Sequence, residues 1–160
     1  MPVQKLKEFL DENGVRYVSI VHSSTFTAQE IAASAHIPGK ELAKTVVARI
    51  DGRMAMAVVP ASLKVDFQRL AEVAGAEEAL LCDEAEFRDK FPGCEVGAMP
   101  PFDNLYGMDV YVSDQLAEDE EIAFNAGSHT ELIRLTYSDF QRLVEPWVGN
   151  ITYGHCLSGT

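Results

Sequence analysis

Apolar residues near the start of the chain recur at the spacing of one helix face. They are Val3, Leu6, Phe9 and Leu10. Because Asn13 and Gly14 follow, a pair that commonly ends a helix, the spacing predicts an amphipathic helix from Val3 to Asn13. The apolar run from Tyr17 to Val21 then predicts a short strand.

A second helix is predicted to begin at the sequence Thr27-Ala28-Gln29-Glu30. This is the capping-box pattern, in which the Thr hydroxyl and the Glu carboxylate each accept a hydrogen bond from a free backbone N–H. The helix should end before Pro38, because proline disfavours helical backbone in the residue that precedes it. Residues 22–26 therefore fall on a loop between a strand and a helix, where functional sites are often built.

The clearest local pattern is that of a β-hairpin. Two β-prone runs, Thr45 to Ile50 and Met54 to Val59, are separated by Asp51-Gly52-Arg53. An Asp-Gly pair favours the tight turns whose twist matches that of two paired strands. We therefore predict that these two runs pair in antiparallel fashion.

Capping residues and apolar runs predict the elements that follow. Asp66 as N-cap and Gly75 as terminator indicate a helix from Asp66 to Ala74, and Ala79 to Cys82 is predicted to be a buried strand. Asp83 begins another predicted helix, which ends near Pro92. Three strands and a last helix are predicted at 108–112, 121–125, 131–135 and 138–144.

This order of elements predicts the fold class. Helices are interleaved with hairpins, and there is no regular β-α-β alternation, so we expect an α+β fold with a mixed, mainly antiparallel sheet and surrounding helices. A single domain is expected over residues 1–146. Residues 147–160 contain glycine and little pattern, and we expect them to form a docked or frayed C-terminal tail.

Length and charge limit the kinds of partner. A chain of 160 residues forms one hydrophobic core without disulfides or a structural metal. With 13 Lys and Arg against 25 Asp and Glu, the net charge is −12, which argues against binding along DNA or an anionic membrane surface. There is no uncharged apolar run of about 18 residues and no signal-peptide pattern, so we expect a cytoplasmic protein. Three dispersed cysteines fit a reducing compartment.

Common catalytic and cofactor motifs are missing from the sequence. It contains no GxGxxG, GxxxxGK(S/T), HExxH or GxSxG motif, and its four histidines lack paired spacing with the cysteines. We therefore predict neither a cofactor nor a metal site. A hydrolase that uses the Cys82 thiol or a dispersed serine stays as a weaker alternative.

Lys44 is the first candidate functional residue. It stands directly before a strand that should be buried. An ammonium group in that position is costly unless it reaches water or an anionic partner, so Lys44 is a candidate anchor for a substrate phosphate or carboxylate. The alternative is a lysine whose aliphatic part lies along the strand edge while its charge reaches water.

Two glycine-containing loops beside predicted strands are the second feature. They run from Gly97 to Phe102 and from Asn125 to His129. Glycine allows close approach of the backbone, and successive N–H groups can bind an anion or form an oxyanion hole. His129 is a candidate base or binding group. The alternative is that both segments are ordinary turns and that His129 is solvated.

Taken in order, these features resemble the YbaK/EbsC family. The resemblance rests on His22 with Thr27, on Leu42-Ala43-Lys44-Thr45-Val46-Val47, on the GxxxP pattern from Gly97 to Pro101, and on Phe124-Asn125-Ala126-Gly127-Ser128-His129. It covers residues 3–145, nearly the whole chain. The family includes free-standing aminoacyl-tRNA deacylases and the editing domain of bacterial prolyl-tRNA synthetases. The resemblance therefore implies hydrolysis of the ester between a mischarged amino acid and the 3′ end of a tRNA.

The resemblance also implies roles for individual residues. Lys44 matches the lysine that the family requires, and Gly97 and Pro101 match its GxxxP loop. His129 matches a histidine that some members carry in the glycine-containing loop, whereas others have a different residue there. We assign these four residues to the catalytic site. The residues expected to bind substrate are His22, Phe26, Thr45, Val46, Met99, Gly127 and Ser128.

A mechanism without a catalytic triad suits this chemistry, because an aminoacyl ester is already reactive. Positioning a water and stabilising the tetrahedral oxyanion supply most of the needed acceleration. We expect the Gly97–Pro101 loop to hold the carbonyl oxygen, Lys44 to hold a phosphate or the attacking water, and His129 to orient the amino group or ribose. The amino acid should be small, such as alanine, cysteine or serine, because one methylene gives only about 1–3 kcal/mol of discrimination and small substrates need a second sieve.

The expected partner is the 3′ end of an aminoacyl-tRNA, and a synthetase that delivers it is a further candidate. A net charge of −12 limits the contact to few phosphates and predicts weak, salt-sensitive binding. We expect no DNA partner and no membrane partner. The alternative function is a regulatory module of the same fold, which binds an aminoacyl or nucleotide end without hydrolysing it. The oligomeric state is left open.

Overall fold

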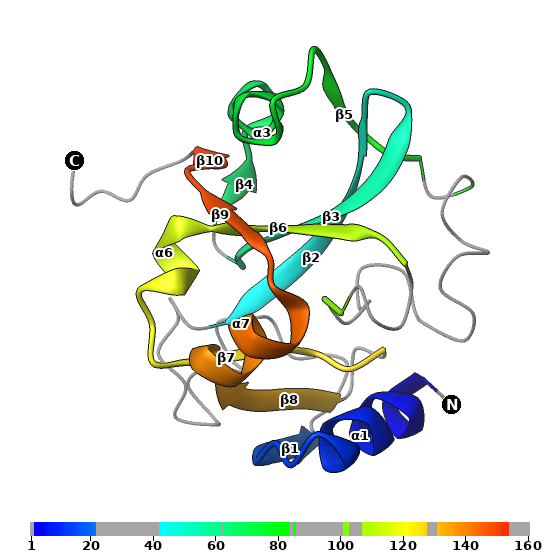
Figure 1. Cartoon of the computed structure of the whole chain (residues 1–160), viewed down its shortest axis with the longest axis vertical. Helices are drawn as coiled ribbons and strands as arrows, with labels where there is room; N and C mark the ends of the chain where they lie inside the picture. The colour runs from blue at the N-terminus through cyan, green and yellow to red at the C-terminus, as the bar shows by residue number, and fades with distance from the viewer. Residues whose placement is uncertain are drawn as a thin grey trace.

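The computed structural model describes residues 2–21, 42–61, 63–83, 85, 101–102, 107–127 and 131–153. In these ranges, two sheets and a short strand pair are packed with helices (Figure 1). The predicted α+β class with a mixed, mainly antiparallel sheet is confirmed. Within the same ranges, we find no helix with the length and apolar character needed to cross a membrane.

The larger sheet has the strand order β5-β2-β3-β6-β9. Its strands are β5 (Ala79–Leu81), β2 (Ala43–Ile50), β3 (Arg53–Pro60), β6 (Asp109–Ser113) and β9 (Trp147–Gly149). Neighbours among β5, β2 and β3 are antiparallel, whereas β6 runs parallel to both β3 and β9. The sheet is mixed because of these two parallel pairs.

The predicted hairpin forms the centre of this sheet, with β2 and β3 paired over their whole length. Its turn residues Asp51 and Gly52 have φ angles of 47° and 85°, a conformation that glycine adopts freely and aspartate tolerates. The Asp51 carboxylate also accepts hydrogen bonds from the backbone N–H groups of Glu77 and Glu78 at 3.0–3.2 Å. The turn is thereby fastened to the segment that leads into β5.

The smaller sheet has the order β1-β8-β7 and is antiparallel throughout. Its strands are β1 (Tyr17–Val21), β8 (Glu131–Thr136) and β7 (Glu121–Asn125). The predicted first helix is α1 (Pro2–Glu12), and the Lys7 ammonium lies 2.8 Å from the carboxylate of Glu131, which also accepts a hydrogen bond from the Ser19 hydroxyl. Burial alone would raise the pKa of Glu131, but these two partners hold it below its usual value. The pair joins α1 to the beginning of β8.

Helix α3 (Phe67–Ala74) begins and ends where the sequence predicts. The Asp66 carboxylate accepts hydrogen bonds from the backbone N–H groups of Gln68 and Arg69 at 3.1 and 3.2 Å. Gly75 ends the helix with a φ of 68°, the left-handed conformation typical of a C-cap glycine. These local signals fix the helix that covers the outer side of the hairpin.

Residues 147–153 belong to the sheets. β9 lies at the edge of the larger sheet beside β6, and β10 (Thr152–Tyr153) pairs with β4 (Lys64–Val65). Ile151 between them is fully buried. The segment predicted to be a docked or frayed tail is therefore docked as far as residue 153, through backbone pairing that its side-chain pattern does not reveal. The domain boundary at residue 146 stays a prediction.

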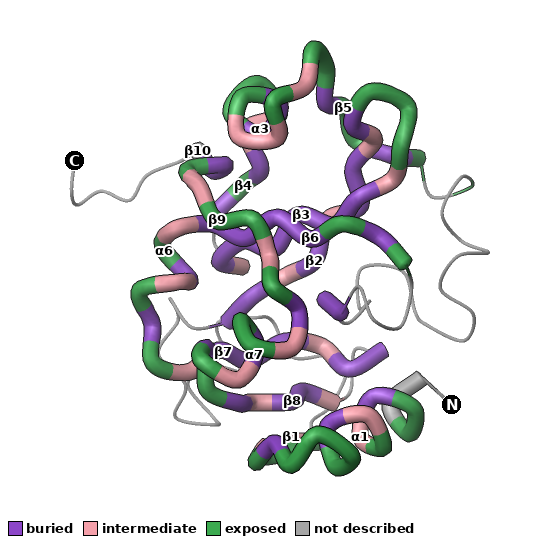
Figure 2. Tube along the Cα trace, in the orientation of Figure 1, coloured by how far each residue is buried: buried purple, intermediate pink, exposed green. Residues whose placement is uncertain are grey.

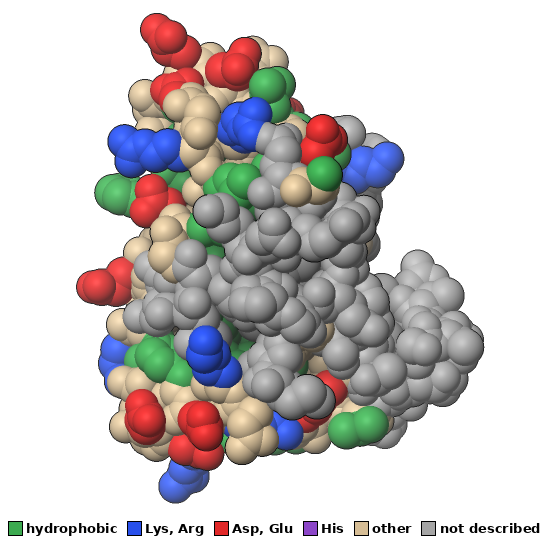
Figure 3. Space-filling view, turned by 90° about the vertical axis from the view of Figure 1, so that its right-hand side faces the viewer, with side chains coloured by type: hydrophobic (Ala, Val, Ile, Leu, Met, Phe, Trp, Pro, Cys, Tyr) green, Lys and Arg blue, Asp and Glu red, His purple; other side chains and the backbone are tan. Residues whose placement is uncertain are grey.

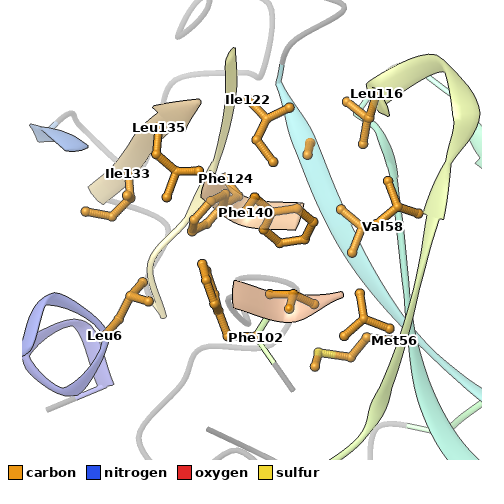
Figure 4. Close-up of a cluster of buried hydrophobic side chains, with 14 of the residues drawn as sticks. Leu6, Met56, Val58, Phe102, Leu116, Ile122, Phe124, Ile133, Leu135 and Phe140 are labelled. Atoms are coloured by element: carbon orange, nitrogen blue, oxygen red, sulfur yellow. The ribbon is translucent and has the colours of Figure 1, made fainter. Parts of the chain in front are cut away.

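The first core lies between the two sheets (Figures 2 and 4). It takes side chains from α1, from inward faces of both sheets, from α6 (Asp114–Ala117) and from α7 (Tyr137–Val144). Phe102 is fully buried at its centre, with ring centroids of Phe9, Phe124 and Phe140 at 6.0, 5.5 and 5.6 Å. Because Phe102 directly follows Pro101, the core anchors the end of the predicted GxxxP loop.

The second core lies on the other face of the β2–β3 hairpin, under α3. Successive side chains of a strand point to opposite faces, and β2 follows this rule. Ala43 and Val47 contribute to the first core, whereas Val46, Ala48 and Ile50 contribute to the second. β2 is thus covered on both faces over most of its length.

One predicted strand differs in burial. Ala79–Leu81 forms β5, but Leu80 and Leu81 are 50% and 66% exposed, because β5 is an edge strand of the larger sheet. The prediction of a buried strand is wrong for these two residues. The helix predicted to begin at Thr27, and most of the helix predicted after Asp83, lie outside the described residues.

Replacing Phe102 by alanine should lower the free energy of unfolding by about 3–5 kcal/mol, because the variant loses three aromatic neighbours and leaves a cavity. Urea unfolding followed by circular dichroism measures the change. The exposed Leu81→Ala variant is the control and should change stability by less than about 0.5 kcal/mol. Equal stability changes in the two variants would contradict the central position of Phe102.

Candidate active site

Lys44 is the second residue of β2 and lies opposite Val59 of β3. By strand alternation its side chain is on the face of Val46, the face that leads to the second core. Lys44 is half-buried, whereas most of its neighbours along β2 are buried. The sequence prediction of a cation at the beginning of a buried strand is therefore confirmed.

The beginning of β2 also meets the smaller sheet. Leu42 forms an isolated parallel bridge with Ala123 of β7, and β2 and β7 are in contact there. Both strands run in the same direction from this bridge, so Lys44 and Asn125 each lie two residues beyond it on neighbouring strands. The bridge thereby joins two segments that are about 80 residues apart in the sequence at the candidate site. A long chain connection between them is expected, because parallel strands cannot be linked by a tight turn.

The glycine-containing loop after β7 is described at Ala126 and Gly127. The Ala126 N–H donates a 3.0 Å hydrogen bond to the Glu131 carbonyl at the beginning of β8. Gly127 is buried and has a φ of 101°, which strongly favours glycine. Ser128 and His129, predicted for substrate binding and catalysis, lie outside the described residues.

The GxxxP loop is described only at its end. Pro101 and Phe102 are buried, and Phe102 belongs to the first core. Gly97 and Met99 lie outside the described residues, as do His22 and Phe26 of the first predicted loop. The roles predicted for these residues stay predictions.

Thr45 and Val46 differ in their surroundings, although both were predicted to bind substrate. Thr45 is 6% exposed and alternates with Lys44, so its side chain is directed to the first-core face. Among the described residues, its hydroxyl has no hydrogen-bond partner. Val46 is half-buried and shares a face with Lys44. The strand therefore brings Val46, and not Thr45, to the same side as Lys44.

Burial and one neighbouring cation act on the Lys44 ammonium group. Burial lowers the pKa of the Lys44 ammonium group, and the positive charge of Lys64 on β4 lowers it further. Among the residues that the structure describes, no carboxylate forms an ion pair with Lys44. Lys64 is a neighbour that the sequence analysis missed, because no motif connects it with Lys44. The only sequence signal is a lysine five residues after Val59, where the second strand of the predicted hairpin ends.

The thiol alternative can be tested on Cys82. Its side chain is 3% exposed, and burial raises the pKa of the thiol. A nucleophilic cysteine needs an accessible thiolate with a lowered pKa. The surroundings of Cys82 therefore argue against this thiol as the nucleophile of a hydrolase.

One pocket of the described residues lies away from Lys44. A pocket of about 350 Å³ lies at the turn end of the hairpin, where Arg53, Asp109 and Tyr111 are among its lining residues. This is the opposite end of β2 from Lys44. In the described part of the chain, His, Cys, Asp and Glu side chains form no group of three that could hold a metal ion.

The order of these elements matches a known domain. The family model described as the aminoacyl-tRNA editing domain matches residues 22–143, which include Lys44, Pro101 and Gly127. The chain belongs to the aminoacyl-tRNA editing domain family. The predicted family and enzyme class are thereby confirmed, because this editing domain is a hydrolase that deacylates aminoacyl-tRNA.

Curated relatives of this editing domain cover most of its length. The multifunctional Ser/Thr-tRNA deacylase ProXp-y of Escherichia coli strain K12 is 28% identical over 153 residues, which cover 92% of this chain and 90% of that protein. The protein of the same name from Escherichia coli O157:H7 matches equally well. The similarity therefore extends over nearly the whole of both proteins.

Solved structures share the fold of this editing domain. The crystal structure of a proposed trans-editing enzyme for prolyl tRNA synthetase has a TM-score of 0.81 at 19% identity, covering 96% of this chain and 98% of that one. The hypothetical protein APE2540 has a TM-score of 0.82 at 18% identity, covering 93% and 99%. At these identities the likeness shows the fold, which extends beyond residue 143 of the family match.

Replacing Lys64 by methionine should raise the pKa of Lys44, because the substitution removes a neighbouring positive charge. Burial and Lys64 both favour the neutral amine, so Lys44 loses its proton at a lower pH than an ordinary lysine. The midpoint should therefore move to higher pH in Lys64→Met. NMR titration of ¹³C-methylated lysines measures it, with Lys5→Met on the exposed side of α1 as control. Equal midpoints in both variants would show that the two charges do not interact.

Proposed function

We propose that this editing domain removes a small amino acid from mischarged tRNA in trans. The observation that carries the proposal is Lys44, a half-buried cation without a described carboxylate partner in a chain that matches the editing-domain family. Such a cation is costly in a protein interior unless an anion or water reaches it. An aminoacyl-tRNA supplies such anions, because phosphates link the terminal nucleotide, which carries the ester, to the nucleotides before it.

The reaction is hydrolysis of the aminoacyl ester. A water oxygen attacks the carbonyl carbon, the bond from that carbon to the ribose oxygen breaks, and the ribose oxygen leaves with a proton. The products are the free amino acid and the uncharged tRNA. We assign Lys44 to hold the terminal phosphate or the attacking water, and N–H groups of the Gly97–Pro101 loop to hold the oxyanion. His129 then orients the amino group or ribose.

Substrate selection should depend on the size of the amino-acid pocket. We assign this pocket to His22, Phe26, Val46 and Met99. A synthetase discriminates poorly between small side chains, so a second hydrolytic site is useful for them. The name of the Escherichia coli relative, a Ser/Thr-tRNA deacylase, makes serine and threonine the first amino acids to test, with alanine and cysteine next.

The setting of the reaction follows from the substrate. We propose that the protein works in the cytoplasm, that it binds the aminoacylated 3′ end, and that an aminoacyl-tRNA synthetase delivers this end. The deacylase unit should comprise residues 1–146. The net charge of the chain, −12, limits how many phosphates it holds. Because the contacts that it does make with phosphates are electrostatic, binding should weaken as salt increases.

Replacing Lys44 by alanine should lower kcat/KM for deacylation by about 100-fold or more, because the variant loses a preorganised cation at the reacting ester. The measurement is release of amino acid from a panel of seryl-, threonyl-, alanyl- and cysteinyl-tRNAs. Lys5→Ala, an exposed lysine on α1, is the matched control and should retain wild-type rates. Wild-type rates in Lys44→Ala on every substrate would show that Lys44 has no role.

The same panel separates the enzyme from a regulatory module. If the wild-type protein bound aminoacyl-tRNA without releasing amino acid from any member, the chain would be a binding module of this fold. A filter-binding assay run beside the deacylation assay distinguishes the two. We expect both binding and release from the wild type.

A further inference from the structure

Lys64 lies on a short segment that backbone hydrogen bonds join to the beginning of β2. The chain turns after β3 through a 3.0 Å hydrogen bond from the Leu63 N–H to the Pro60 carbonyl. The Ala61 N–H donates a 2.7 Å hydrogen bond to the Leu42 carbonyl. These bonds fasten the turn to the residue that precedes β2, two positions before Lys44.

The backbone of Lys64 is held from both sides. It pairs with Tyr153 in the β4–β10 ladder, and the Asp66 N–H that follows donates a 2.8 Å hydrogen bond to the Ile151 carbonyl. Val65 is buried in the second core, while Lys64 is exposed. The segment therefore presents a lysine to solvent on a fixed backbone, which suits a binding group better than a loop does.

The acidic residue nearest to Lys64 in the sequence already has other partners. Asp66 caps α3 and forms an ion pair with Arg69 at 3.3 Å. Among the residues that the structure describes, no carboxylate forms an ion pair with Lys64 or with Lys44. By contrast, Lys7 on α1 is neutralised by Glu131.

Two cations, Lys64 and Lys44, thus lie on adjoining backbone segments without a described counter-ion. Their repulsion is consistent with the lowered pKa of Lys44, to which burial contributes most and Lys64 also contributes. In a chain with a net charge of −12, this pair is a local positive site. On the face shown in Figure 3, cationic and anionic side chains of the described residues are interspersed, so the positive character there is not spread over a wide area.

We propose that Lys64 binds a backbone phosphate of the tRNA acceptor end while Lys44 acts at the ester. This inference rests on the proposed function. The phosphate on the 5′ side of the terminal nucleotide is separated from the aminoacyl ester by one ribose. A cation next to Lys44 is therefore within reach of that phosphate, and the phosphate neutralises the repulsion between the two lysines. Lys64 is a binding residue in this assignment and does not touch the reacting atoms.

The test compares two substrates that share the same ester. One is the aminoacyl-tRNA that the wild type hydrolyses fastest, and the other is the same amino acid on the 3′ oxygen of adenosine, which has no phosphate. Lys64→Glu should raise KM for the tRNA about tenfold, because it loses a charged contact. Any change in kcat that arises through the pKa of Lys44 should be equal on the two substrates. The KM of the variant for the aminoacyl-adenosine should stay at the wild-type value, because this substrate has no phosphate to lose.

Controls separate binding from folding. Lys64→Arg should restore most of the affinity for tRNA, and Lys5→Glu, with the same charge change on α1, should leave KM within about twofold. The dependence of log KM on log salt should become shallower by about 0.7 in Lys64→Glu, the value for one phosphate contact to a single strand. Equal urea midpoints for the variants show that the fold is intact.

Three results would overturn the assignment. An unchanged KM for tRNA in Lys64→Glu would remove the phosphate contact. An equal loss of activity on tRNA and on aminoacyl-adenosine would show that Lys64 acts through Lys44 or the fold. Failure of the wild type on both substrates would overturn the proposed function as well, and is distinguishable because it needs no variant.

Discussion

The register of the β2–β3 hairpin is the constraint on which the rest of the structure depends. β2 is covered on both faces, so each residue along it has a fixed side. A shift of the pairing by one residue would exchange the faces and direct the Lys44 ammonium into the first core. The Asp51-Gly52 turn, with positive φ at both residues, prevents this shift by fixing where the two strands begin to pair.

Much of this arrangement could be predicted because its signals are local. Asp66 and Gly75 predict the two ends of α3, and the Asp51-Gly52 pair predicts the hairpin. Pairing between distant segments has no such signal. The parallel contact of β6 with β3, the bridge from Leu42 to Ala123, and the docking of residues 147–153 depend on which surfaces remain uncovered once the local elements have formed.

The candidate site shows the same division. Lys44 could be found from the sequence because it is a cation directly before an apolar run. Gly127 has a positive φ, which agrees with the prediction that this loop needs the conformational freedom of glycine. Strand alternation separates Thr45 from Lys44, although the motif lists them side by side. Lys64 belongs to no sequence motif. Its segment lies beside the beginning of β2 because the Ala61 N–H donates a hydrogen bond to the Leu42 carbonyl, and no local pattern predicts that bond.

The lowered pKa of Lys44 links folding to substrate binding. Folding places the ammonium group where burial, and then the charge of Lys64, disfavour protonation, so the folded state holds its proton less tightly than the unfolded chain. The stability of the apo-protein therefore rises as pH increases through the folded pKa toward the ordinary lysine value. A bound phosphate reverses this preference, because it favours the charged amine. In the proposed function, the feature that costs stability in the free protein is thus the one that gives an anionic substrate its affinity.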